Sequence, residues 1–145
     1  MQIELRKEYG QTDIENLVEA FAEKYTSIPK LQQTIELTKC TKPMMVDDFF
    51  IWKALSEGAK YTESTFITYA EVFNVLTARR VELLEYLEHH KPASIIEIAN
   101  ALNRDYKNVY DDISALEDAG LITTQKKGRN VLIQSTVNSI IISFQ

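Results

Sequence analysis

Hydrophobic positions in the first part of the chain follow first a strand spacing and then a helix spacing. The alternation at residues 3–5 predicts a short strand. From Asp13 onward, apolar residues recur on one helical face, and this predicts a helix that ends near residues 27–29. A second helix is predicted over Val46 to Glu57, the most aromatic segment of the chain. Residues 30–43 are mixed and polar, so the pattern assigns no element there.

Capping signals become sharper after Tyr61. Thr68-x-x-Glu71 is a capping box that predicts a short helix continuing to Leu76. Thr77 is then placed to cap a helix from Ala78 to about His89, which carries leucines on its inner face. Pro92 cannot continue this helix.

Two further helices are predicted with only a tight turn between them. Ser94-x-x-Glu97 is a second capping box and opens the first of them. Asn103 tolerates the left-handed conformation of such a turn, and Asp105 suits the N-cap of the following helix. That helix should end at Gly120. The arrangement predicts a helix-turn-helix.

A β-hairpin is predicted directly after these helices. Residues 121–124 and 131–135 have strand character, and residues 125–130 supply the Gly and Asn of a turn together with three cations. Residues 140–144 predict one more strand. The order of helix, helix, turn, helix and basic hairpin is that of a winged helix.

The expected fold is therefore mainly α with a small β-hairpin wing, in the α+β class. We expect a winged helix-turn-helix domain over residues 61–145 and an N-terminal helical segment over residues 1–60. At 145 residues, with 45% hydrophobic and 26% charged residues and few Gly or Pro, the chain should be ordered throughout. No apolar run indicates a signal peptide or a membrane span, and the single cysteine, Cys40, fits a reducing compartment. The cytoplasm is the expected location.

Charge restricts how such a protein can bind DNA. The chain carries a net charge of −5, which argues mildly against binding nucleic acid by bulk electrostatics. Residues 77–145 are close to neutral, with eight Lys or Arg against nine Asp or Glu. Any contact with DNA must therefore depend on a few well-placed cations.

A helical wheel of the third helix of the domain places the candidate DNA-reading residues on its outward face. Asn108 is the best candidate for reading a base, because its amide can bind adenine at two points. Arg104 and Lys107 suit bases or phosphates equally, and Ser114 shares their face. Asp111 is the main objection, since a carboxylate on this face repels phosphate, although it can accept from cytosine.

Further candidates flank this face. Tyr106 and Tyr110 are placed either to donate to phosphate or to pack over the edge of the core. Lys126, Lys127 and Arg129 at the hairpin tip should reach the DNA backbone or the minor groove. A basic hairpin tip alone is often only a solvated turn; its position after a helix-turn-helix favours DNA contact.

Residues 62–145 resemble a prokaryotic family of DNA-binding winged-helix proteins related to the MarR-type regulators. The resemblance rests on Val75-Leu76-Thr77, on the run from Arg104 to Val109, on Asp112 and Leu116, and on Gly120-Leu121-Ile122. It implies a transcriptional regulator, in some members an antitoxin encoded beside a small toxin, with autoregulation of the operon as a natural role. The chain departs from the family at Asp111, where a basic residue is common, and in residues 28–60, which have the character of an insertion.

The sequence offers no constellation that suggests catalysis, a metal or a cofactor. We find no Gly-rich phosphate loop, no nucleophile elbow and no metal-ligand spacing. The neighbours His89 and His90 point to different sides of a helix end, and Asp47 and Asp48 diverge along a helix. We therefore expect a protein that is not an enzyme.

The number of base pairs that must be read indicates which partners to expect. One recognition helix reads few base pairs, so a homodimer on a two-fold operator is expected on double-stranded DNA. The aromatic residues Phe49, Phe50 and Trp52 suggest that the N-terminal segment forms the dimer core, and deletion of residues 1–60 should then abolish dimerisation. Packing of these aromatics inside the monomer is an equal alternative. The competing function is a winged-helix module that docks proteins without DNA, and an antitoxin would also bind a toxin through residues 1–60.

Overall fold

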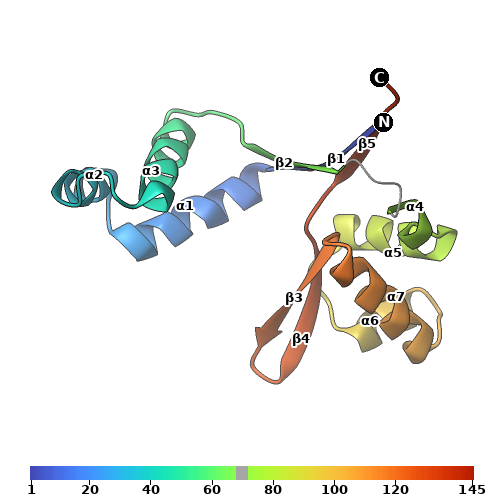
Figure 1. The fold of residues 1–145 in the computed structure, drawn as a ribbon. Helices are drawn as coiled ribbons and strands as arrows, with labels where there is room; N and C mark the ends of the chain where they lie inside the picture. The colour runs from blue at the N-terminus through green and yellow to red at the C-terminus, as the bar shows by residue number, and fades with distance from the viewer. Residues whose placement is uncertain (68–71) are drawn as a thin grey trace. The chain divides into compact units, whose positions relative to one another are not determined.

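The computed structural model describes residues 1–67 and 72–145, and the chain divides into two compact units. Unit 1 consists of Met1–Lys7 and Ser64–Gln145, and unit 2 of Glu8–Glu63. Helices combine with small antiparallel sheets, as Figure 1 shows, which confirms the expected α+β class. No helix of the described residues is long and apolar enough to cross a membrane.

Unit 2 is built from α1 (Gln11–Tyr25), α2 (Ile28–Leu37) and α3 (Pro43–Ser56). The pattern correctly predicts α1 and α3 to within a few residues, but it misses α2. Pro29 lies in the first turn of α2, where a proline is tolerated because its missing N–H would have no partner. Ser27 caps this helix by accepting from the backbone N–H of Lys30 at 3.3 Å. The proline that was interpreted as the end of one helix therefore begins the next.

The core of unit 2 explains the aromatic content of α3. Trp52 is buried and stacks on Phe21 of α1, with ring centroids 5.8 Å apart. Phe49 packs partly buried against the same cluster, whereas Phe50 is exposed. Of the two alternatives for these aromatics, packing inside the monomer therefore holds for Trp52 and Phe49.

Unit 1 contains the β2-β1-β5 sheet, formed by β1 (Gln2–Glu8), β2 (Thr62–Ile67) and β5 (Ser139–Ser143). β1 pairs antiparallel with β5, so that Ile3 faces Ile142 and Leu5 faces Ile140. Ile3 and Leu5 are buried in the core of unit 1. Met1–Lys7 therefore belong with the C-terminal region and not with the N-terminal helical segment, while the units divide again between residues 63 and 64, close to the expected boundary at residue 60.

The helices of unit 1 are α4 (Val72–Val75), α5 (Ala78–His89), α6 (Ile95–Ala101) and α7 (Tyr106–Asp118). Both bonds of the Ser94–Glu97 capping box are present, and Thr77 caps α5 by accepting from the backbone of Arg80. Asn103 has a φ of 52°, the left-handed conformation predicted for the turn between α6 and α7. Asp105 is the N-cap of α7 but makes no side-chain capping bond. The predicted capping box at Thr68 and Glu71 lies outside the described residues.

The hairpin consists of β3 (Ile122–Lys127) and β4 (Asn130–Ser135). Its strands are longer than predicted because the turn is only Gly128-Arg129, with Lys127 paired to Asn130. Gly128 has a φ of 66°, and a positive φ at the first turn position is what a type II′ hairpin turn requires. Ala93 adds a backbone bridge to Ile133 of β4, which the sequence pattern does not predict.

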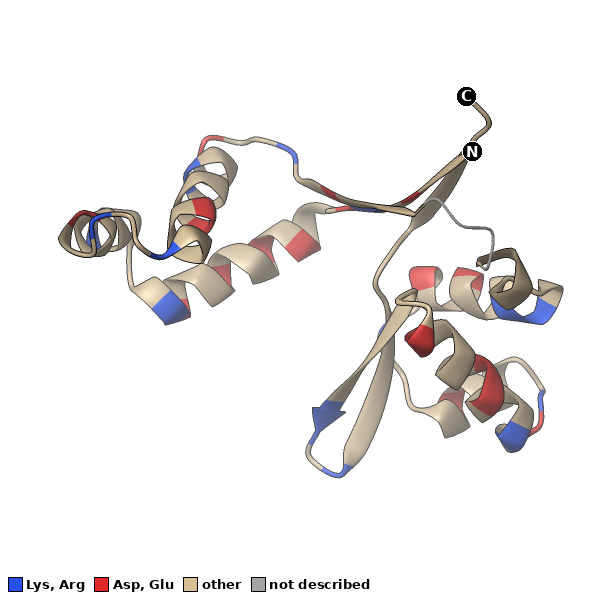
Figure 2. Cartoon of the chain, viewed as in Figure 1, with Lys and Arg blue, Asp and Glu red and all other residues tan. Residues whose placement is uncertain are grey.

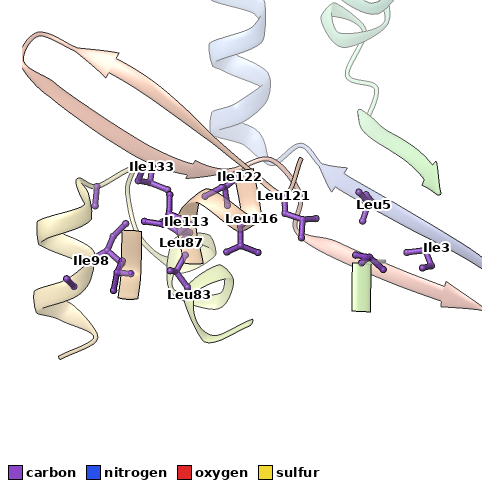
Figure 3. Close-up of a cluster of buried hydrophobic side chains, with 14 residues drawn as sticks. Ile3, Leu5, Leu83, Leu87, Ile98, Ile113, Leu116, Leu121, Ile122 and Ile133 are labelled. Atoms are coloured by element: carbon purple, nitrogen blue, oxygen red, sulfur yellow. The ribbon is translucent and has the colours of Figure 1, made fainter. Parts of the chain in front are cut away.

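One hydrophobic cluster joins these elements (Figure 3). Leu83 of α5, Ile98 of α6 and Leu116 of α7 are fully buried in it. Leu121, just before β3, and Ile133 of β4 pack in the same cluster, so the hairpin is attached to it through both strands. This core fixes the position of α7 and the hairpin relative to the other helices of unit 1.

Candidate nucleic-acid interface

The face that α7 presents to solvent is the one predicted. Val109, Ile113 and Leu116 recur at helical spacing and are buried, so the remaining face points outward. The residues of α7 that are exposed include Tyr106, Lys107, Asn108, Tyr110, Asp111 and Ser114. Five of the predicted DNA contacts are therefore on the surface.

Arg104 is the exception among the candidates. Its side chain is only 9% exposed, and its Nη2 donates to Oδ2 of Asp112 at 2.6 Å. Since α7 begins at Tyr106, Arg104 lies in the preceding turn and not on the helical face on which the wheel placed it. The predicted role of Arg104 as an outward-facing contact is therefore corrected.

Asp112 connects Arg104 to a second arginine. Its Oδ1 accepts from Nε of Arg80 on α5 at 3.1 Å, while Nη1 of Arg80 donates to the carbonyl of Val75 at 3.1 Å. Nη1 of Arg104 is buried and makes no hydrogen bond within the described part of the chain. The Arg80–Asp112–Arg104 network thus attaches α7 to the start of α5, the end of α4 and the turn before α7. Sequence reasoning missed it because 32 residues separate Arg80 from Asp112.

The two tyrosines of α7 lie against each other. Their rings stack at a centroid distance of 6.4 Å, and Tyr106 and Tyr110 are 50% and 51% exposed. Each hydroxyl group therefore stays accessible to solvent or to a partner. This arrangement fits a surface contact better than the alternative of packing over the core edge.

The three cations of the hairpin are also exposed. Side chains alternate along a strand, so Lys126 and Lys127 lie on opposite faces of the β3–β4 ribbon, and Arg129 occupies the turn. Within the described residues we find no ion pair for these three side chains or for Lys107. In Figure 2 the Lys and Arg segments at the hairpin tip and at the N-terminal end of α7 lie toward the same side of unit 1.

Acidic residues are also exposed on α7. Asp111 follows Lys107 by one helical turn, and Glu117 and Asp118 lie at the opposite end of the helix. The first turn of α7 carries Lys107 and the later turns carry acids, while the exposed carboxylate of Asp105 lies at the N-cap beside Lys107. The hairpin cations, together with Lys107 and the positive end of the α7 dipole, are the features of this surface that attract phosphate.

Residues considered for metal binding or catalysis do not come together. Among the described residues no group of three His, Cys, Asp or Glu side chains is placed to hold a metal ion. His90 stacks on Tyr86 at 4.0 Å, and its Nδ1 lies 2.7 Å from the Tyr86 carbonyl. Cys40 is exposed and makes no disulfide.

One comparison with known proteins finds a match that lies within unit 1. A family model named HVO_A0114, whose name states no function, matches residues 75–142. The match begins at the end of α4 and runs through the helices and the hairpin into β5, covering slightly less than half of the chain. A comparison with curated proteins found no match.

Proposed function

We propose that α5 to α7 and the β3–β4 hairpin form a winged helix and that the protein is a sequence-specific DNA-binding transcriptional regulator. It acts as a homodimer on a two-fold operator in the cytoplasm. Autoregulation of its own operon, as an antitoxin, is the extension that the family resemblance suggests.

The observation that carries this proposal is that exposed cations lie both in the first turn of α7 and at the tip of the hairpin. Lys107 lies in the first turn of α7, and Lys126, Lys127 and Arg129 lie at or beside the β3–β4 turn. Figure 2 shows the Lys and Arg segments of the hairpin tip and of the N-terminal end of α7 at the same end of unit 1. A short turn between α6 and α7 followed by an exposed N-terminal turn is the form in which recognition helices meet the major groove. Ala93 bridging to β4 supports the winged-helix assignment, because it connects the hairpin to the segment before α6.

The geometry assigns different work to the two elements. Asn108 lies in the first turn of α7, where its amide can donate to and accept from an adenine edge, while Lys107 beside it serves guanine or phosphate. Lys126, Lys127 and Arg129 contact phosphates on either side of the hairpin. Tyr106 and Tyr110 donate to phosphates next to the groove.

Fluorescence anisotropy across a salt series tests this proposal. The purified protein is titrated against the DNA upstream of its own coding sequence and against a scrambled duplex. Asn108→Ala should remove the preference for the upstream DNA, with a discrimination loss of about 1–3 kcal/mol. Arg129→Ala should weaken binding to both duplexes and make the slope of log K against log salt shallower by about 0.9.

Lys30→Ala, which removes one exposed cation from unit 2, is the matched charge control. It should change neither the preference nor the slope by more than a small fraction of the Arg129→Ala effect. Equal binding of the parent to both duplexes would contradict base reading.

Protein docking is the second candidate function, and the exposed acids of α7 are the observation that favours it. The stacked tyrosines beside Asp111 form an exposed aromatic surface that repels phosphate, and aromatic residues are enriched at protein-binding surfaces. Absence of binding to either duplex at low salt would favour this function over DNA recognition.

A further inference from the structure

The outer edge of β5 has the chemistry of a covered surface. β5 is the last strand in the β2-β1-β5 order, and within the described residues no strand pairs with its other edge. Its sequence, Ser-Ile-Ile-Ile-Ser, contains no charge and no proline. Exposed edge strands in natural proteins are usually protected by charged residues or prolines, because an unprotected edge pairs with other strands. A partner strand is therefore expected here.

An apolar groove continues from this edge to α5. It has a volume of about 530 Å³, and most of its lining surface is apolar, with polar and charged side chains among the residues that line it. On the α5 side it is lined by Val81 and Leu84 together with Glu85, Glu88 and His89, and on the β5 side by Ser139, Ile140 and Ile142. Since β5 is paired with β1 along its other edge and no β1 residue lines the groove, the groove lies on the unpaired side of β5.

The sequence of β5 identifies what fits this edge. Residues 139–143 read the same in both directions around Ile141. Antiparallel pairing with a second copy, centred on Ile141, therefore places Ser139 opposite the partner's Ser143 and Ile140 opposite the partner's Ile142. Residues that face each other in an antiparallel pair point to the same side of the sheet. The partner's Ile140 and Ile142 thus enter the groove against α5.

The same register gives a place to an aromatic side chain that unit 1 leaves in solvent. Phe144, next to β5, is 83% exposed. With Ile141 at the centre, Phe144 lies opposite the partner's Asn138, a residue that lines the end of the groove. Phe144 also lies on the same side of the strand as Ile140 and Ile142. It would therefore close the partner's groove.

We propose that two copies of this chain pair through their β5 strands in an antiparallel two-fold arrangement, which joins their sheets in the order β2-β1-β5-β5-β1-β2. Each copy covers the other's groove, so the interface uses the same surface twice. This proposal relocates the expected dimer interface from residues 1–60 to β5, since unit 2 buries Trp52 within its own core. It rests on the proposed function only in that a two-fold operator calls for two copies.

Light scattering of the full chain without DNA tests the interface, so its result is independent of the anisotropy test. The parent should have the mass of a dimer at micromolar concentration. Ile142→Asp places a carboxylate in each apolar groove and should raise the dissociation constant by roughly 100-fold, giving a monomer. Val131→Asp is the matched control, because Val131 is an aliphatic residue of the β3–β4 hairpin whose exposed fraction is 40%, against 38% for Ile142. It should remain a dimer.

Cysteine cross-linking determines the register without depending on a destabilised variant. In a Cys40→Ser background, Ile141→Cys should form an intermolecular disulfide, because centred pairing brings the two residue-141 Cα atoms to about 4.5–5.5 Å. Val131→Cys should not cross-link. Far-UV circular dichroism checks that each variant keeps the parent's fold.

Three results would each overturn the proposal. The first is a monomeric parent at about 100 μM, which would assign the groove to another protein or to a small apolar ligand. The second is an Ile142→Asp variant that is folded and still dimeric. The third is cross-linking at residue 131 that is as fast as at residue 141.

Discussion

Unit 1 and unit 2 differ in how the chain assembles them. Unit 2 is one continuous segment, Glu8–Glu63, and its core comes from helices that follow one another. Unit 1 combines Met1–Lys7 with Ser64–Gln145, and its sheet pairs residues from the two ends of that range. β1 and β2, which flank unit 2 in sequence, are neighbours in the sheet. Unit 2 therefore has the topology of a domain inserted between two adjacent strands.

Contacts at the base of unit 2 fit this interpretation. The backbone N–H of Tyr9 donates to the carbonyl of Tyr61 at 2.9 Å, which brings the start and end of the unit together. Both tyrosine hydroxyl groups donate to Oε1 of Glu63, at 3.0 and 3.3 Å. Burial and this carboxylate raise the pKa of Tyr9 above its usual range. Close ends are what allow one domain to be inserted into another without disturbing it.

The largest expected effect is the difference in folding between a chain that keeps β1 and a chain that lacks it. Replacing residues 9–61 with an Asn-Gly turn should leave unit 1 folded, because both flanking strands stay in place. Deleting residues 1–63 removes β1 and takes Ile3 and Leu5 out of the core. Each buried aliphatic contributes about 1.5–3 kcal/mol, a large part of a domain stability of about 5–15 kcal/mol, so this fragment should not fold.

Thermal unfolding followed by far-UV circular dichroism compares the two fragments. A cooperative transition in the excised chain and none in the truncated chain is expected. Loss of folding in both would show that unit 1 depends on unit 2 and would contradict the insertion.

The next effect uses the single tryptophan as a reporter of one unit. Trp52 lies in the core of unit 2, so its fluorescence follows the unfolding of that unit alone. Phe21→Ala should lower the stability of unit 2 by about 3–5 kcal/mol and shift the fluorescence transition. Leu116→Ala should lower the stability of unit 1 by about 2–5 kcal/mol and leave that transition in place.

Urea unfolding with fluorescence and circular dichroism recorded together is the measurement. If either substitution moved both probes by the same amount, the two units would unfold as one cooperative body. That result would break the comparison between them.

A smaller effect is expected at the network that attaches α7. Asp112→Asn removes the charge that pairs with Arg80 and with the buried Arg104. The stability of unit 1 should fall by about 1.5–3 kcal/mol, as for hydrogen bonds to charged groups, and DNA affinity should fall with it. Asp111→Asn, next in sequence but exposed, is the control and should change stability by less than about 0.5 kcal/mol.

The two neighbours should have opposite effects on DNA binding. Asp111→Asn removes a repulsive charge from the α7 surface, so its affinity for DNA should rise. Chemical denaturation and anisotropy on the same preparations check both quantities. Equal loss of stability from the two substitutions would remove the positioning role given to Asp112.

The smallest expected effect concerns Glu4 of β1. Hydrogen bonds donated by Arg6 and Ser64 lower the pKa of Glu4 below its ordinary value of 4.5. Because the pKa of Glu4 is lower in the folded state, its ionised carboxylate stabilises unit 1 at pH values above the ordinary pKa. This stabilisation is lost as the pH falls through the folded-state pKa. Ser64→Ala should raise the pKa of Glu4 and reduce the pH dependence of the stability of unit 1 between about pH 3 and 5.

Carboxyl NMR titration measures the pKa directly, and Trp52 fluorescence serves as the internal control. The pH dependence of the unit 2 transition should be the same in the parent and in Ser64→Ala. An unchanged Glu4 pKa would show that Ser64 does not stabilise the carboxylate.

Local signals predicted much of unit 1. Thr77, Ser94 and Asn103 each act within four residues along the chain, and all three have the predicted caps or conformation. The exposed stretch from Tyr106 to Asn108 followed from the periodicity of α7 alone. These features could be predicted because the interactions that set them are short in sequence.

The features that escaped prediction depend on residues far apart in sequence. Arg104 was expected on the surface because nothing nearby indicated its pairing with Arg80 through Asp112. The sequence suggested Trp52 as part of a partner surface because it gave no sign that Phe21 stacks on it. The β1–β5 pairing likewise joins two strands whose patterns predict only that each is a strand.

The β1–β5 pairing also sets an order of events during synthesis. Gln2 leaves the ribosome early, but its partner in the sheet, Ser143, is made after both the helices of unit 2 and those of unit 1. Unit 2 can fold in that interval because its contacts are local, and β1 can pair with β2 as soon as residues 62–67 are made, but Ile3 and Leu5 stay uncovered until the helices of unit 1 follow. The nascent chain therefore carries an apolar strand face that needs protection until unit 1 is complete, and chaperone dependence should follow the time taken to translate the residues between β1 and β5.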